Sequence, residues 1–248
     1  MTLDGRVTLV TGGAIRVGRA IVEALAAEGA TLAIHLHASV EEAKALVAEL
    51  RSKGRRAEAF RADLTDDAQL TGLVSQVERS LGPIQVLVNS AAGFTRAPFL
   101  NTDAGMLDAE WRLNARAPFL LTREVARGML ERREGVVVNV LDIGGALVPW
   151  RNYSAYCMTK AAMSMLTQVL ALELAPHVRV NGVAPGTVLP PESLEAEERE
   201  RLRSGIPLER FGRAEDVAET VRFLVTGPDF ITGEVIAVDG GRVRGNRR

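Results

Sequence analysis

The feature that most constrains the fold is an alternation of short apolar runs with longer amphipathic stretches, which continues along most of the chain. Several runs are apolar at almost every position, as expected when helices cover both faces of a parallel sheet. We therefore predict an α/β fold, a doubly wound parallel sheet of about seven strands with helices on both faces. The strands are predicted at 7–10, 31–36, 56–60, 84–89, 135–141, 178–184 and 235–238, and the helices at 16–28, 40–53, 66–81, 105–132, 153–175 and 214–226.

No repeat, linker or composition break divides the 248 residues, so we predict a single domain over 1–248. Residues 186–210 depart from the alternation, with a Pro190-Pro191 pair before a charge-dense stretch. This segment could form a lid over a ligand or a solvated surface helix, and both alternatives stay open. The basic tail at 242–248 could bind phosphate or a neighbouring subunit, but a solvated terminus is the interpretation that we favour.

Composition argues against several classes of partner. The formal net charge of −1 gives no overall attraction to nucleic acid or to an anionic membrane. Cys157 is the only cysteine, which excludes an intrachain disulfide. No apolar run approaches the roughly 20 residues of a membrane span, and the first residues lack the pattern of a secretory signal. We expect a cytoplasmic protein with no metal site.

A glycine-rich turn, Thr11-Gly-Gly-Ala-Ile-Arg-Val-Gly18, follows the first predicted strand and opens the first helix. Glycines allow the backbone to turn tightly and to approach a pyrophosphate, which the N–H groups and dipole of a helix N-terminus favour. Such a turn is weak evidence alone, because glycines end strands in many proteins. Its place after the first strand of an α/β pattern predicts a dinucleotide site.

The end of the second strand indicates which dinucleotide binds. NAD-binding sheets usually carry Asp or Glu there, whereas this chain has no carboxylate in 35–39. Arg16 could pair with a 2′-phosphate, and His37 and Ser39 could add donors, which favours NADPH. The alternative is that Arg16 is a surface charge and the histidines are strand-end polar residues. Asp63 ends the third strand and either accepts from the adenine amino group or caps a helix that starts at Leu64.

Tyr156 and Lys160 are four residues apart at the start of a predicted helix, so their side chains share one face. A free tyrosine has a pKa of about 10. A nearby cation favours the phenolate, and we expect Lys160 to lower the pKa of Tyr156 toward a useful acid–base range. The pair is common by chance, and in isolation a surface helix pair would be the better interpretation.

The pair does not stand in isolation, because the chain resembles the short-chain dehydrogenase/reductase family, with its Rossmann-type fold, over nearly its whole length. The matching landmarks, in order, are Thr11-Gly-Gly-Ala-Ile-Arg-Val-Gly18, Asp63, Asn89-Ser-Ala-Ala-Gly93, Asn114, Asn139-Val-Leu-Asp142, Tyr156-x-x-x-Lys160, Pro185-Gly186, Gly212-Arg-Ala-Glu-Asp216 and Asp239-Gly-Gly241.

The resemblance implies roles for individual residues. Tyr156 would donate a proton as hydride passes between the nicotinamide and the substrate, and Lys160 would bind the nicotinamide ribose. Asn114 would hold a water in the proton relay, and Asn89 would form a wall beside the cofactor; otherwise Asn114 is a helix residue tied to backbone and Asn89 a turn former. The cofactor-binding residues are Gly12, Arg16, Val17, Gly18, His37, Ser39, Asp63, Leu64, Asn89, Ala91, Tyr156, Lys160, Pro185, Gly186 and Val188.

Asp142 stands where most members of the family carry Ser, and in this it is similar to the pteridine reductase branch. A carboxylate can accept from the amino groups of a guanidine-like ring. Phe94 matches an aromatic residue that stacks a pterin on the nicotinamide in that branch, although it could be a hydrophobic plug on a loop. Ala38 and Ala92 depart from the branch, which often has a basic residue and a hydroxyl there.

The resemblance therefore implies an NADPH-dependent reductase of a pterin-type ring, with Tyr156, Lys160, Asp142 and Asn114 as catalytic residues and Phe94, Asp142 and Tyr156 at the substrate. One alternative is a 3-oxoacyl-thioester reductase or another carbonyl reductase of the same family. An alternative from another class is a catalytically silent dinucleotide-binding regulator. Members of the family are usually homotetramers, which the apolar face of 153–175 allows.

Overall fold

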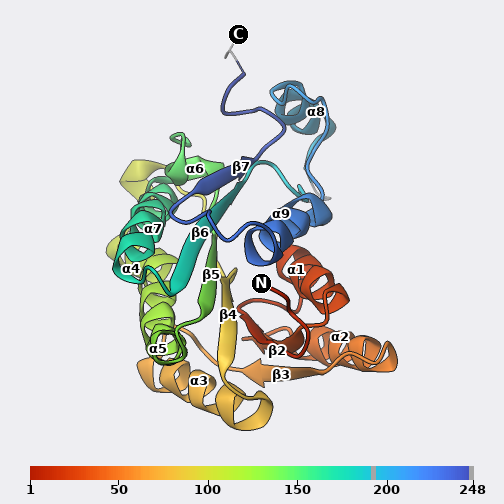
Figure 1. Cartoon of the computed structure of the whole chain (residues 1–248). Coiled ribbons are helices and arrows are strands. Elements are labelled where there is room, and N and C mark those ends of the chain that lie inside the picture. The colour runs from red at the N-terminus through yellow and green to blue at the C-terminus, as the bar shows by residue number, and fades with distance from the viewer. Residues whose placement is uncertain (191–193, 246–248) are drawn as a thin grey trace.

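Seven parallel strands form one sheet in the computed structural model, which describes residues 1–190 and 194–245. Their order across the sheet is β3-β2-β1-β4-β5-β6-β7 (Figure 1). This confirms the predicted doubly wound sheet, and the observed strand ends differ from the predicted ones by at most one residue. The strands are β1 (Val7–Val10), β2 (Thr31–Leu36), β3 (Ala57–Arg61), β4 (Ile84–Asn89), β5 (Gly135–Val140), β6 (Val178–Pro185) and β7 (Val235–Val238).

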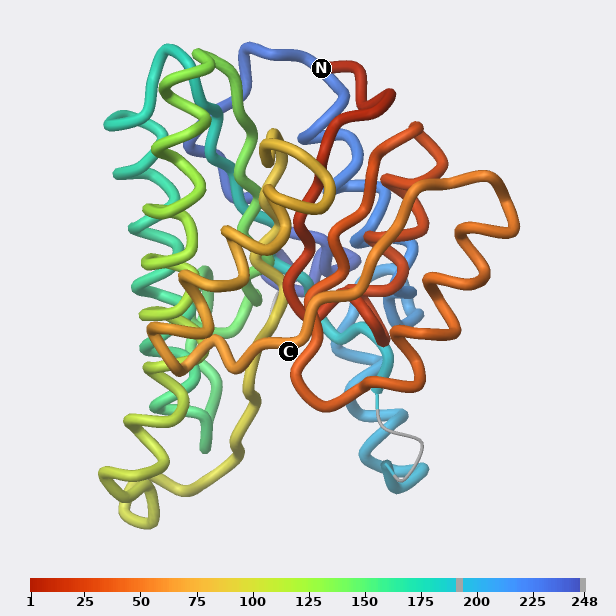
Figure 2. The backbone as a smooth tube through the Cα atoms, turned by 90° about the horizontal axis from the view of Figure 1, so that it is seen from below, coloured from red at the N-terminus to blue at the C-terminus, as the bar shows by residue number. Residues whose placement is uncertain are grey.

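Helices cover both faces of this sheet. One layer holds α1 (Arg16–Ala27), α2 (Val40–Ser52) and α9 (Ala214–Thr226), and the other holds α3 (Asp67–Leu81), α4 (Ala104–Trp111), α5 (Ala117–Arg132) and α7 (Ser154–Glu173). The two layers lie on opposite sides of the strands when the chain is viewed from below (Figure 2). Each layer has its own apolar core against the sheet, with Ile21 and Val221 in one and Leu121 and Val125 in the other, all at most 1% exposed.

The strand order reverses between β1 and β4, which is where doubly wound sheets bind their ligands, outside the carboxyl ends of the strands. The turn after β1 and the loop after β4 therefore meet at one edge of the sheet. Neighbouring strands are in parallel register there, with Val10 opposite Val88 and Asn89 opposite Asn139. The short helix α6 (Ile143–Ala146) and the start of α7 also lie at this edge (Figure 1).

The helix predicted at 105–132 is not uniform. A π-helical turn over Arg112–Arg116 separates α4 from α5, and Asn114 lies within it. A π turn adds a residue to the helical repeat and is often found at functional sites, because it redirects the side chains and backbone groups around it. Residue spacing alone did not reveal this turn.

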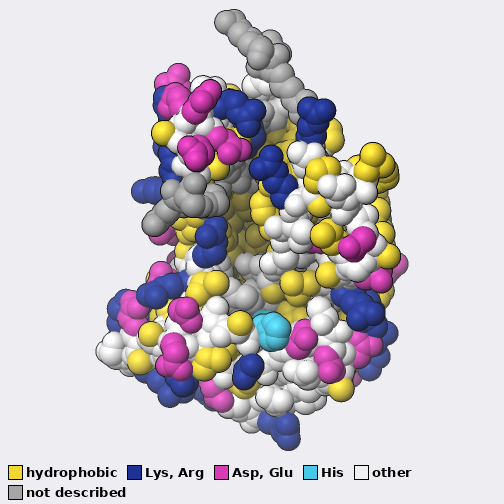
Figure 3. Space-filling view, turned by 180° about the vertical axis from the view of Figure 1, so that it is seen from behind, with side chains coloured by type: hydrophobic (Ala, Val, Ile, Leu, Met, Phe, Trp, Pro, Cys, Tyr) yellow, Lys and Arg dark blue, Asp and Glu magenta, His cyan; other side chains and the backbone are white. Residues whose placement is uncertain are grey.

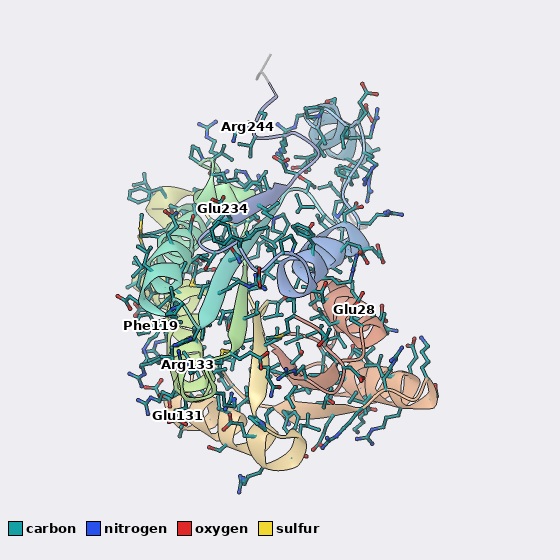
Figure 4. The ribbon with its side chains drawn as sticks, viewed as in Figure 1. Glu28, Phe119, Glu131, Arg133, Glu234 and Arg244 are labelled. Atoms are coloured by element: carbon teal, nitrogen blue, oxygen red, sulfur yellow. The ribbon has the colours of Figure 1, made fainter. Side chains whose placement is uncertain are left out.

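The segments expected to form a lid and a tail lie beyond the carboxyl ends of β6 and β7. Helix α8 (Ala196–Ser204) and the C-terminal segment both project from that end (Figure 1). Parts of both predictions, 191–193 and 246–248, lie outside the described residues. The beginning of the tail is not simply solvated as we expected, since Arg242 donates to the Thr187 hydroxyl and its guanidinium lies 5.7 Å from the centroid of the Trp150 ring. Arg244, further along, is exposed (Figure 4).

Within the described ranges, no helix combines the length and the apolar character needed to cross a bilayer.

Candidate active site

The glycine-rich turn after β1 forms one wall of a large cavity at the strand-order reversal. Gly12 has φ of +62°, a conformation that other residues adopt only with strain, and a Cβ on Gly18 would lie 2.0 Å from the Gly12 carbonyl oxygen. The cavity has a volume of about 860 Å³. Of the residues predicted to bind the cofactor, those that line it are Gly12, Arg16, Val17, Gly18, His37, Asp63, Leu64 and Ala91.

The first turn of α1 faces this cavity without a side-chain cap. Ile15 occupies the position before the helix and makes no capping hydrogen bond, so its side chain does not compete for the first N–H groups. In contrast, the Asp66 carboxylate caps α3 by accepting from the Ala68 and Gln69 amides. An uncapped helix start beside close-packed glycines suits the phosphates of a dinucleotide.

His35, which the sequence pattern did not single out for this purpose, holds the glycine-rich turn in place. Its ring is 2% exposed; Nδ1 accepts from the Gly12 amide at 3.1 Å, and Nε2 lies 3.1 Å from the Ala62 carbonyl oxygen. Burial lowers the pKa of His35 to about 4. The ring is therefore neutral at ordinary pH and can both accept and donate. A histidine within an otherwise apolar strand was the available signal.

The predicted adenosine end of the cavity carries separate cationic and acidic groups. Arg16 is exposed and donates to the Leu189 carbonyl at 3.0 Å, and His37 lines the cavity nearby. Asp63 accepts from the Thr65 amide and hydroxyl, and these hydrogen bonds lower its pKa. The cap of α3 is Asp66, which contradicts the alternative of a helix cap at Asp63. Ser39 precedes α2 and does not line the cavity.

Thr11 joins the glycine-rich turn to the loop after β4. Its hydroxyl accepts from the amides of Ser90 at 2.9 Å and Ala91 at 3.0 Å, which fixes the backbone that lines the cavity. The Asn89 side chain donates instead to Thr122 and to Asn139, its neighbour in register on β5. The large cavity is therefore lined there by the residues that follow Asn89, while Asn89 itself lines a smaller cavity.

Tyr156 and Asp142 meet at the carboxyl end of β5. The buried Tyr156 hydroxyl donates to Oδ2 of Asp142 at 3.1 Å, and Oδ1 of Asp142 accepts from the Gly144 amide at 2.6 Å. Burial raises the pKa of Asp142 to about 6. Burial first and then the Asp142 carboxylate raise the pKa of Tyr156 above its ordinary value. This differs from the lowered pKa that we expected, because desolvation and a carboxylate outweigh the ammonium one turn away.

Lys160 lies on the same face of α7 as Tyr156, with its amine 5.6 Å from the centroid of the phenol ring. The side chain is buried, and Nζ donates to the Val140 carbonyl at 3.1 Å. Burial lowers the pKa of Lys160 to about 8. Lys160 and Asn114 both line the smaller cavity, of about 10 Å³, which has room for about one water molecule. This cavity shares Leu64, Ala91 and Leu113 with the lining of the large one.

Asn114 binds the loop that carries Phe94. Its side-chain amide accepts from the Gly93 amide at 2.8 Å and donates to the Gly93 carbonyl at 3.0 Å, and it also donates to the buried Glu110 carboxylate. The side chain is therefore tied to the backbone of this loop and to Glu110, as in the alternative to a water-holding role. Glu110 was not predicted, because an acidic residue on a helix gives no sequence signal of burial.

Three aromatic rings, those of Phe94, Trp150 and Tyr153, form a cluster with the ring of Tyr156. The Phe94 ring is 54% exposed; it stacks on Tyr153 with centroids 4.6 Å apart and meets Tyr156 edge-on at 4.8 Å. Trp150 contacts Phe94 edge-on at 6.2 Å. A hydrophobic plug would be covered, whereas Phe94 offers an exposed ring beside the phenol. Flat ring systems bind well to such surfaces.

The remaining predicted cofactor-binding residues lie at the end of β6 and directly after it. Pro185 ends this strand, and the Gly186 amide donates to the Val238 carbonyl at 2.9 Å. A Cβ on Gly186 would lie 2.8 Å from Asp239, so glycine permits the close approach of two chain segments. Val188 pairs with Gly212 in an isolated bridge. None of the three lines the 860 Å³ cavity.

Seen from behind, the surface is hollowed between the upper left and the upper right of the molecule, and Lys and Arg side chains lie along this hollow (Figure 3). A glycine-rich turn with an uncapped helix start at the strand-order reversal is typical of doubly wound sheets that bind a dinucleotide. The family model described as Enoyl-(Acyl carrier protein) reductase matches residues 13–242. The chain belongs to the short-chain dehydrogenase/reductase family of oxidoreductases.

Relatives of known activity cover nearly the whole chain. A 2,3-dihydro-2,3-dihydroxybenzoate dehydrogenase of Bacillus subtilis is 35% identical, with 98% of each chain aligned. The 3-oxoacyl-[acyl-carrier-protein] reductase FabG of Thermotoga maritima is 36% identical over 98% of this chain and 100% of its own length. A crystal structure of FolM alternative dihydrofolate reductase 1 from Brucella canis, complexed with NADP, superposes with a TM-score of 0.92 at 34% identity, covering 100% of this chain and 97% of that one.

Proposed function

We propose that this oxidoreductase uses NADPH to reduce a pterin-type ring, from dihydropterin to tetrahydropterin. The observation that carries the proposal is the hydrogen bond between the Tyr156 hydroxyl and the Asp142 carboxylate, beside the exposed ring of Phe94. A hydroxyl at position 142 would suit a simple carbonyl oxygen, whereas a carboxylate suits the guanidine-like edge of a pterin. The FolM relative, named as a dihydrofolate reductase, supports the same class of substrate.

The choice of NADPH rests on the second strand and on Arg16. No acidic residue stands in 37–39, directly after β2, and Arg16 and His37 both line the cavity, where they could bind a 2′-phosphate. The cavity of about 860 Å³ and the uncapped start of α1 fit a dinucleotide, and FolM was crystallised with NADP. NADPH, when bound, supplies the hydride for the reduction.

The residues of this chain would then supply binding and the proton. Tyr156 is protonated at neutral pH, as a proton donor in the reducing direction must be, although burial and the Asp142 carboxylate raise its pKa and make it a weaker acid. Lys160 would bind the nicotinamide ribose and, with a pKa of about 8, could return a proton to Tyr156 through the neighbouring one-water cavity. Asp142 would accept from the ring's amino group, and Phe94 would cover the ring's face.

The second candidate is reduction of a 3-oxoacyl thioester, which the identity to FabG favours. A screen of NADPH consumption against dihydropterins, dihydrofolate and an acetoacetyl thioester separates the two. We expect turnover of the dihydropterins. Turnover of the thioester alone would overturn the proposal, and NADPH binding without turnover of any of them would favour the silent regulator.

Two substitutions test the site itself. Tyr156→Phe should reduce kcat by at least about 100-fold, the scale of a lost general acid, while NADPH affinity stays nearly unchanged. If turnover survived, Tyr156 would not be the proton donor. Asp142→Ser should impair dihydropterin reduction more than reduction of a simple ketone, and equal effects would remove the reason to prefer pterins.

We also propose that the chain assembles as a homotetramer through α5 and α7. Large apolar side chains are exposed on these helices, with Phe119 47%, Met165 59% and Leu172 82% exposed. Phe119 lies on the outer side of the helical layer (Figure 4). Sedimentation of the protein at micromolar concentration tests the assembly, and a monomer would contradict it.

A further inference from the structure

A buried carboxylate, Glu110, accepts a hydrogen bond from Asn114 and has no role in the proposed reaction described so far. It belongs to the last turn of α4 and is only 3% exposed. Burying a charge costs free energy unless the charge is paired or hydrogen-bonded, so a glutamate as buried as Glu110 requires compensating partners. Among the ion pairs of the described residues, none involves Glu110.

Hydrogen bonds satisfy this carboxylate from two sides. Oε1 accepts from the backbone amide of Thr95 at 2.7 Å, and Oε2 accepts from the side-chain amide of Asn114. Both partners are donors, and only a carboxylate presents two acceptor oxygens to them. Glutamine has the same shape but would turn an NH₂ group toward one of the two donors.

The two contacts enclose the loop residue Phe94. Asn114 binds the amide and the carbonyl of Gly93, on one side of it, and Glu110 binds the amide of Thr95 on the other. Residues 91–96 form neither helix nor strand, so regular structure does not fix the backbone there. The backbone on both sides of Phe94 is therefore held by a buried clamp made of Glu110 and Asn114.

We propose that Glu110 is a positioning residue that fixes the 93–95 loop and thereby sets the Phe94 ring against the substrate. The inference rests on the proposed pterin reductase, because it assigns to the clamp the placement of a flat ring. A mobile loop would have to be ordered when the substrate binds, and that cost would weaken binding. Glu110 would therefore act on the KM of a planar substrate through Phe94, without touching that substrate.

Glu110→Gln tests the proposal, with Glu131→Gln as a matched control. Glu131 is exposed near the far end of α5 (Figure 4). We expect Glu110→Gln to raise the KM for a dihydropterin about tenfold and to change kcat by less than about twofold. A tenfold rise corresponds to the loss of roughly one charge-assisted hydrogen bond. Glu131→Gln should change neither constant.

A double-mutant cycle shows whether Glu110 acts through Phe94. In a Phe94→Leu background, Glu110→Gln should raise KM by less than about twofold, because the ring that it positions is gone. An equal rise in both backgrounds would overturn the proposal, as would an unchanged KM in the otherwise native chain. If Glu110→Gln does not fold, Glu110→Asp, which keeps the charge but is too short to reach both donors, replaces it in the same cycle.

A measurement without substrate separates this inference from the proposed function. Amide hydrogen exchange at Thr95 should become at least about tenfold faster in Glu110→Gln than in Glu131→Gln, because glutamine can satisfy only one of the two donors and the loop opens more often. If exchange is faster but the protein does not reduce dihydropterins, the clamp is supported and the proposed pterin substrate is refuted. Unchanged exchange would refute the clamp whatever the substrate.

Discussion

Replacing Asp142 by Asn should stabilise the folded protein at neutral and alkaline pH, even though it harms the proposed activity. Burial raises the pKa of this carboxyl from 3.8 to about 6, despite the Gly144 amide, the Lys160 ammonium and the Tyr156 hydroxyl, which all act to lower it. The ionised form is therefore disfavoured in the folded state relative to the unfolded chain. Asparagine keeps an acceptor for the Gly144 amide and carries no charge to bury.

The expected size follows from the pKa difference. A shift of about two units at about 1.4 kcal/mol per unit corresponds to about 3 kcal/mol. Below the unfolded value of 3.8, Asp142 is protonated in both states and its contribution to stability is fully present. This contribution is lost as the pH rises through about 6, because the folded protein must then hold a buried charge. The advantage of Asp142→Asn should therefore grow by about 3 kcal/mol between acid and alkaline pH.

Urea unfolding at fixed protein concentration, followed by far-ultraviolet circular dichroism from about pH 4 to about pH 8, measures this difference. Asp108→Asn serves as the control for the loss of a carboxylate, because Asp108 is exposed on α4. A stability gap between Asp142→Asn and the native chain that stays constant over this range would refute the reasoning. So would a gap that widens toward acid pH.

Three further substitutions test other parts of the molecule. His35→Leu should cost about 2 kcal/mol and weaken NADPH binding about tenfold, because it leaves the Gly12 amide and the Ala62 carbonyl unpaired. Since the pKa of His35 is lowered from 6.5 to about 4, the contribution of His35 to stability is lost as the pH falls through this range, opposite in sign to that of Asp142. The stability of His35→Leu relative to the native chain should therefore rise toward acid pH, and a constant difference would contradict the assignment. Arg16→Ala should weaken NADPH binding about 10- to 100-fold in a fluorescence titration and leave NADH binding nearly unchanged, whereas equal losses would argue against a 2′-phosphate contact. Leu121→Ala should reduce the free energy of unfolding by about 2–5 kcal/mol in urea, because Leu121 is 0% exposed and a cavity would remain; a loss below about 1 kcal/mol would mean that the core closes around it.

The sequence by itself determined the layers of the fold, because continuous apolar runs directly indicate strands that are buried on both faces. Helical spacing placed Tyr156 and Lys160 on one face of α7, and the amine indeed lies 5.6 Å from the phenol ring. Both inferences depend on residues close together in the chain, for which local geometry is enough.

Tertiary structure decided what depends on contacts between distant segments. The raised pKa of Tyr156 follows from burial and from a carboxylate on another element, and the role of His35 requires the register of β2 against the turn after β1. Glu110 is an ordinary helix residue until folding brings Thr95 over its carboxylate. Electrostatics and hydrogen bonding act through space, so the sequence specifies which groups are present, but only the packed chain determines which of them meet and how much water remains around them.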